Sequence, residues 1–117
     1  MTDTATYDAP GLPSVTVTRE TSATTGRSTY TISVELLGLD PVRSITSEER
    51  SLGITSISPP AVRGQRISDL IELAIVATGN AYNATDGYAI DPDILATISA
   101  RVSQASLQAF RLLGENV

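Results

Sequence analysis

This 117-residue chain contains no cysteine, histidine, lysine or tryptophan. Without cysteine it can form no disulfide, no thiolate metal site and no cysteine nucleophile. Without histidine it lacks the commonest general base and metal ligand, and without lysine a serine nucleophile has no amine to activate it. Many enzyme mechanisms are therefore excluded. We expect no catalytic residue, no metal and no cofactor.

Aromatic residues and long apolar runs are also scarce. The chain has four tyrosines and one phenylalanine, so its core must be built mainly from isoleucine, leucine, valine and alanine. No segment is long enough to span a bilayer, and the N-terminal residues form neither a basic nor an apolar leader region. We therefore expect no membrane partner and no secretion signal, which leaves a cytoplasmic or virion location.

The net charge of −5 disfavours non-specific binding to nucleic acid. Four arginines nevertheless make the middle of the chain locally positive: Arg43, Arg50, Arg63 and Arg66. They could be solvated surface residues whose stems cover apolar neighbours, or a rim that pairs with a neighbour's carboxylates or with RNA phosphate. The lack of interleaved aromatic residues counts against recognition of single-stranded nucleic acid.

Residues 1–13 carry two prolines, one glycine and almost no apolar pattern. This composition predicts an extended N-terminal arm, followed by a single α+β domain over residues 14–117. The arm could be a disordered tail. Alternatively, it could order by lying on another subunit, with Tyr7 and Leu12 as its anchors.

Alternating apolar and polar residues predict strands in the first half of the chain. The alternation runs from Ser14 to Arg19 and from Ser28 to Leu37, which is typical of half-buried strands in an antiparallel hairpin. Weaker patterns predict two more strands at 43–47 and 52–57, separated by a charged tip at 48–50, so the sheet would contain about four strands. We expect four residues of the second strand to point into the core: Tyr30, Ile32, Val34 and Leu36.

Two helices are predicted in the second half. The first covers Arg66–Gly79 and ends at Gly79, because glycine readily adopts the left-handed conformation that closes a helix. After a loop at 80–90, Asp91 is a favoured N-cap and Pro92 a favoured first helical residue, and the apolar face continues to Leu113. Asp86, Asp91 and Asp93 are close in sequence, but helix capping accounts for two of them and their spacing does not match a calcium loop.

The first helix is apolar over more than half of its circumference, which exceeds what one sheet can cover. The second carries small residues at Ala105 and Ala109 on its apolar face, where another helix could approach closely. We therefore predict contacts between subunits, anchored at these residues: Tyr7, Leu12, Ile75, Ala105, Ala109 and Leu112.

The predicted architecture is a small antiparallel sheet followed by two C-terminal helices packed on one of its faces. This order of elements is similar to that of the coat subunits of small single-stranded RNA phages, although those subunits have more strands and share no motif with this chain. The first functional hypothesis is a non-enzymatic structural subunit that self-assembles into a homo-oligomeric particle such as a capsid or tail component, with other structural proteins of that assembly as further partners. The alternatives are a small protein-binding or regulatory module, and an enzyme or small-ligand carrier.

Overall fold

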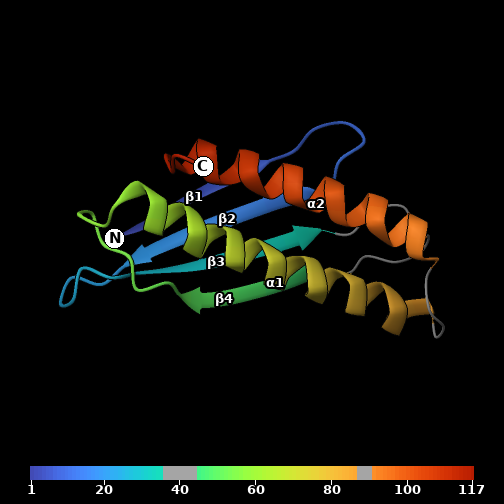
Figure 1. Cartoon of the computed structure of the whole chain (residues 1–117), viewed down its shortest axis with the longest axis horizontal. Helices are drawn as coiled ribbons and strands as arrows, with labels where there is room; N and C mark the ends of the chain where they lie inside the picture. Colours follow the sequence, from blue (N-terminus) through green and yellow to red (C-terminus); the bar gives the residue numbers. More distant parts are fainter. Residues whose placement is uncertain (36–44, 87–90) are drawn as a thin grey trace.

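A computed structural model of the chain shows four β-strands followed by two long α-helices (Figure 1). The structure describes residues 1–35, 45–86 and 91–117, and for residues 45 and 82–86 it describes the backbone alone. The element order confirms the predicted α+β class. The elements are β1 (Thr2–Tyr7), β2 (Ser14–Thr21), β3 (Ser28–Glu35), β4 (Ile45–Ser51), α1 (Pro60–Asp86) and α2 (Pro92–Leu113).

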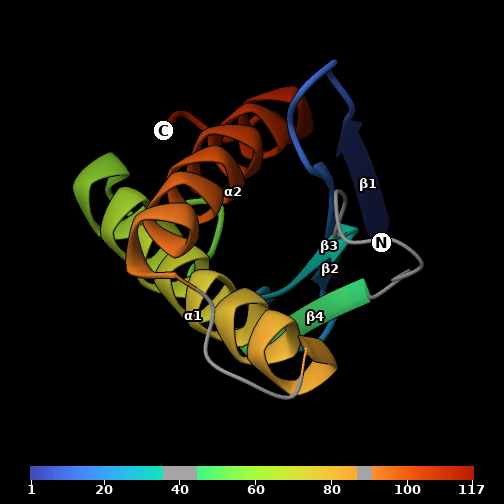
Figure 2. The same cartoon turned by 90° about the vertical axis from the view of Figure 1, so that its right-hand side faces the viewer.

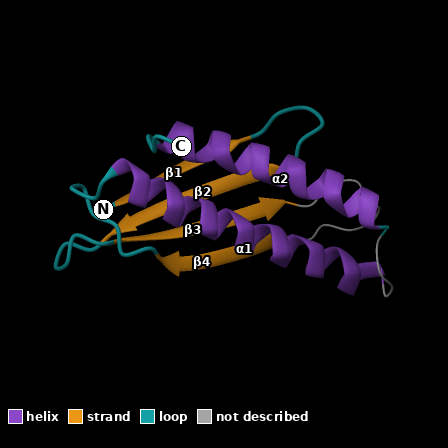
Figure 3. Ribbon diagram, in the orientation of Figure 1, coloured by secondary structure: helices purple, strands orange, loops and turns teal. Residues whose placement is uncertain are grey.

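The strands form one antiparallel sheet in the order β1-β2-β3-β4, so each strand pairs with the next along the chain. Both helices lie on the same face of this sheet, α2 over β1 and β2, and α1 over β4 and β3 (Figure 3). The view along the long axis shows the two layers, helices on one side and sheet on the other (Figure 2). No described helix covers the opposite face of the sheet.

The core lies between these two layers. Tyr30, Ile32 and Val34 are fully buried, which confirms their predicted direction, whereas Leu36 lies outside the described residues. The two largest buried side chains, Tyr30 and Phe110, are in contact, with ring centroids 5.7 Å apart. Thr31 is only half-buried, as expected for a sheet that is covered on one side. Buried aliphatic residues complete the core: Val15, Val17, Ile54, Ile67, Leu70, Ile71, Ala74, Val102, Ala105 and Ala109.

The structure corrects the predicted N-terminal arm, because its first half is a strand of the sheet. β1 pairs antiparallel with β2 from Thr2↔Glu20 to Tyr7↔Val15. The sequence TDTATY has no run of apolar residues, since its inward positions are Asp3, Ala5 and Tyr7. Pairing with the strongly patterned β2, together with the packing of Tyr7 against the core, orders this segment.

The fourth strand also differs from the prediction. The residues 48–50, expected as a charged tip, lie inside β4, and residues 52–57, expected as a strand, form a loop. Charged side chains are common on edge strands because they remain in water there. Gly53 adopts a φ of 68°, and the loop buries Ile54 against the core.

Helix α1 is longer at both ends than the predicted Arg66–Gly79. It begins at Pro60, where the missing N–H costs nothing, and the Pro59 carbonyl accepts from Arg63 N (3.1 Å). It continues through Gly79, which is buried and not a helix terminator. A Cβ at Gly79 would lie 3.3 Å from Leu95 Cδ1, so glycine lets the two helices approach closely at this point.

The start of α2 agrees with the prediction. Asp91 is the N-cap, its Oδ1 accepts from Asp93 N (2.8 Å), and Pro92 is the first helical residue. The helix ends at Gly114 with a φ of 103°, and this left-handed turn reverses the chain so that Glu115 N donates to Phe110 O (3.0 Å).

Candidate interaction surfaces

The face of the sheet opposite the helices, which we call the open face, is a regular array of hydroxyl side chains. Side chains alternate between faces along each strand, so the register assigns the residues of this face. Three complete rows cross the four strands, and every position is serine or threonine except Glu20 and Glu49. The rows are Thr2–Glu20–Thr29–Ser51, Thr4–Thr18–Thr31–Glu49 and Thr6–Thr16–Ser33–Ser47.

Neighbouring hydroxyls on the open face bond to each other across strands. The distance between the hydroxyl oxygens is 2.9 Å for Thr6 and Thr16, and 3.4 Å for Thr4 and Thr18. Such a face carries no aromatic ring on which a base or sugar could stack, and it offers no apolar area to another core. Its chemistry suits contact with water or with other hydroxyl and amide groups.

The free edge of β1 presents unpaired backbone groups. Thr21 N donates to Met1 O (3.0 Å) and Met1 N donates to Thr21 O (3.4 Å), so odd-numbered residues of this segment bond to β2. Because bonding alternates along an antiparallel pair, the N–H and C=O groups of Thr2, Thr4 and Thr6 point away from the sheet. They meet no partner among the described residues.

The opposite edge, β4, also has no partner strand in the described part of the chain, but it differs in charge. Its sequence ITSEERS places Glu48, Glu49 and Arg50 consecutively, whereas the only charged residue of β1 is Asp3. Consecutive charges on an edge strand oppose pairing with another strand. Charge therefore opposes pairing with a further strand at the edge of β4, but not at the edge of β1.

A cluster of charged side chains lies at the end of the sheet near the C-terminus. Glu115 is nearly inaccessible to solvent, and its Oε1 accepts from Tyr30 Oη (2.6 Å), Arg19 Nη1 (2.8 Å) and Arg63 Nη2 (2.7 Å). Its Oε2 accepts from Arg63 Nη2 (2.8 Å) and Nε (3.2 Å). Arg19 also pairs with Asp3 (3.0 Å), so the cluster joins β1, β2, β3, α1 and the C-terminal residues.

Protonation equilibria in this cluster follow from burial and these bonds. Burial alone would raise the pKa of Glu115, but hydrogen bonds from Arg63, Tyr30 and Arg19 outweigh it and lower that pKa below its ordinary value. Burial and the bond to Glu115 raise the pKa of Tyr30 to about 12. A carboxylate that is held by three donors is a weak base, so the cluster is suited to cross-linking the fold and not to proton transfer.

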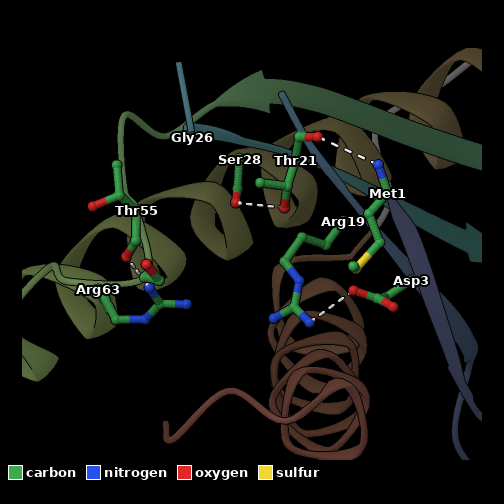
Figure 4. A pocket seen from close by; sticks show the side chains of 9 residues that line it. Met1, Asp3, Arg19, Thr21, Gly26, Ser28, Thr55 and Arg63 are labelled. Carbon is green, nitrogen blue, oxygen red and sulfur yellow. Dashed lines mark hydrogen bonds and ion pairs between the residues drawn. The ribbon is translucent and has the colours of Figure 1, made fainter. Parts of the chain in front are cut away.

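A shallow pocket of about 350 Å³ borders this cluster. Figure 4 shows Arg19 and Arg63 on its walls, with Arg19 directed to Asp3 and Arg63 to Thr55. Both guanidinium groups are thus already bonded to groups of the chain, and hydroxyls of Thr21 and Ser28 bond to each other (3.2 Å). The pocket therefore offers few free donors to a ligand.

The predicted interface residues differ in their exposure to solvent. Ala105 and Ala109 are fully buried in the core of the single chain, so a neighbouring subunit cannot contact them, which corrects their predicted role. Tyr7 and Ile75 are half-buried and pack against the core, and Leu12 is half-buried in the loop after β1. Leu112, by contrast, is 63 % exposed and remains available to a partner.

The four arginines of the central segment do not form one cluster. Arg63 binds Glu115 of its own chain, and Arg43 lies outside the described residues. Arg50 and Arg66 are exposed and line a depression of about 250 Å³ between β4 and α1, together with Asp69. The carboxylate in this depression reduces its attraction for phosphate.

Among the described residues there is no group of three or more acidic side chains placed to hold a metal ion. No described helix is long and apolar enough to cross a bilayer.

No pattern in the sequence predicts the cluster around Glu115. Arg19 and Glu115 are separated by 96 residues, and a lone glutamate after a helix has the pattern of a solvated surface residue. The one local hint is the Gly114-Glu115 pair, because a glycine that ends a helix fixes the direction of the residue after it.

The chain was compared with known proteins. No family model matches the sequence, and no curated protein or solved structure is significantly similar to it.

Proposed function

We propose that this chain is a non-enzymatic structural subunit that self-assembles into a larger homo-oligomeric particle, of which a virion shell is one kind. The observation that supports this proposal is the unpaired edge of the sheet at β1. The helices cover one face, and within residues 1–35, 45–86 and 91–117 no strand pairs with the outer edge of β1. An unpaired strand edge is a template for another chain, and assembly is one way in which proteins satisfy it.

Exposed aliphatic residues on the helices support the same proposal. Val62 and Val76 are separated by about four turns of α1, and Ile94 and Leu112 by about five turns of α2, so each pair lies on one side of its helix. All four side chains are between 44 % and 63 % exposed. Subunit contacts in permanent assemblies are richer in such residues than ordinary surface is.

A protein-binding module is the alternative that the same edge favours. A strand from a different protein could extend the sheet at β1, since main-chain bonds supply affinity in that mode without a specific pocket. This alternative predicts that the chain alone is a monomer.

Sedimentation velocity over a range of micromolar concentrations separates the two. We expect species whose mass is a multiple of 12.3 kDa, and particles of uniform size by negative-stain microscopy. A single 12.3 kDa species at every concentration would contradict self-assembly and favour the binding module.

A further inference from the structure

We infer that two copies of this chain pair through their β1 strands, antiparallel and about a two-fold axis at Thr4, to form one continuous sheet. This inference rests on the proposed function, because it names the contact that joins two subunits. It follows from the backbone register of β1, the distribution of charge along the two edges and the threonines at the free edge.

The register selects the position of the axis. Opposite residues of a hydrogen-bonded antiparallel pair exchange both of their backbone bonds, so outward-pointing residues must face each other. An axis at Thr4 places Thr4 opposite the same residue of the second copy, and Thr2 opposite Thr6. All three outward-pointing threonines then gain a partner. An axis at Asp3 or at Ala5 would pair only two of them.

The same register is compatible with both faces of the sheet. On the helix face, Asp3 lies opposite Ala5 of the second copy, so no two like charges meet, and Asp3 can remain bound to Arg19 (3.0 Å). On the open face, threonine lies opposite threonine, a favourable cross-strand pair. The helices of both copies lie on one side, and the hydroxyl rows of the open face continue across the axis.

The other edge is less suited to pairing over its full length. Full-length antiparallel pairing of β4 with its own copy would centre on Glu48, the middle residue of Ile45–Ser51. The two Glu48 carboxylates would then lie directly opposite each other, which destabilises a strand pair. Charge thus disfavours full-length self-pairing of β4, whereas β1 pairs over its full length without opposing like charges.

A head-to-tail arrangement is the main competitor. If β1 paired with β4 of the next copy, Thr4 could lie opposite Glu49 and Asp3 opposite Arg50. Such a contact does not close on itself and would generate filaments instead of two-fold pairs.

Disulfide trapping tests the axis directly, because the chain has no cysteine of its own. In the Thr4→Cys variant the two Cα atoms at the axis would be about 5.5 Å apart, which is within the range of about 4.4–6.8 Å for a disulfide. Under mild oxidation we expect a covalent dimer on a non-reducing gel. The matched control is Thr18→Cys, which lies beside Thr4 on β2. There the Cα atoms of the two cysteines would be about 14 Å apart, and no covalent dimer should form.

Edge prolines test the contact without a cross-link. Thr4→Pro removes an N–H that points away from the sheet, so the single chain should tolerate it, as circular dichroism would verify. Loss of the two central bonds should raise the dissociation constant of the pair by about tenfold to a hundredfold. Ser47→Pro makes the same change on the edge of β4 and should leave the dissociation constant unchanged.

The outcomes separate this inference from the function on which it rests. An unmodified protein that stays monomeric overturns both. An oligomeric protein whose Thr4→Cys variant does not cross-link overturns the two-fold pairing alone and leaves self-assembly intact. Cross-linking that requires a mixture of Thr4→Cys and Glu49→Cys chains would overturn the two-fold pairing in favour of the head-to-tail arrangement.

Discussion

Replacement of Glu115 by glutamine should destabilise the domain far more than loss of a surface carboxylate. The side chain is 2 % exposed and accepts bonds from Tyr30, Arg19 and Arg63. Glutamine keeps the shape but removes the negative charge, so two guanidinium groups lose their shared counter-ion. The substitution therefore isolates the electrostatic part of the cluster.

The expected loss of stability follows from the burial of the Glu115 cluster. Removing one partner of a buried ion pair costs about 3–5 kcal/mol, because the other charge remains buried without compensation. Here the two arginine side chains are 22 % and 23 % exposed, and Arg19 keeps Asp3, so water and Asp3 offset part of that cost. We expect a loss of about 2–4 kcal/mol in the free energy of unfolding. For a domain of this size the melting temperature should fall by roughly 8–16 °C.

Chemical and thermal denaturation of the Glu115→Gln variant would measure this loss, with Glu20→Gln on the open face as the control. The difference from the unmodified protein should also depend on pH. The pKa of Glu115 is lowered in the folded protein, so its contribution is present above the ordinary value of 4.5 and is lost as pH falls through the folded value. A loss no larger than that of Glu20→Gln, or one that does not shrink in acid, would refute this account of the cluster.

Three other substitutions test the fold. Asp91→Ala removes the N-cap of α2 and should cost about 0.5–2 kcal/mol in urea denaturation, and an unchanged midpoint would contradict the capping role. Val34→Asp places a carboxylate in the core and should unfold the domain by circular dichroism, whereas Ser33→Asp on the open face, with Thr16 and Ser47 beside it, should cost less than about 1 kcal/mol. Ser106 is fully buried and its hydroxyl has no partner among the described residues. Ser106→Ala should therefore leave the free energy of unfolding unchanged or raise it by up to about 2 kcal/mol. A lower free energy of unfolding would show that the hydroxyl does form a hydrogen bond.

The placement of Ala105 and Ala109 changes one expectation about assembly. From the sequence, glutamates at these positions would dissociate subunits that remain folded. In the structure both alanines face the core of their own chain, so carboxylates there would unfold the domain. Deletion of residues 1–13 would likewise remove a strand and the Asp3 carboxylate from the fold, and not a detachable arm.

The sequence by itself determined the features that depend on neighbouring residues. Alternation along residues 28–35 specifies a strand with one buried face, since side chains of a strand point to opposite sides in turn. Asp91 and Pro92 specify where α2 begins, because a cap acts within one turn of helix. These local rules were sufficient for the α+β class and for the succession of a sheet and two C-terminal helices.

Only the tertiary structure decided the features that depend on distant residues. β1 has too few apolar residues for its sequence to predict a strand, and it is a strand because β2 pairs with it. Arg19, Tyr30 and Arg63 meet one carboxylate from positions 96, 85 and 52 residues away, and no sequence period records such separations. Ala105 and Ala109 show the same limit, since periodicity identifies an apolar face but does not say which surface covers it. In this fold the sheet of the same chain covers that face, so contacts between subunits must use other surfaces, such as the edge of β1.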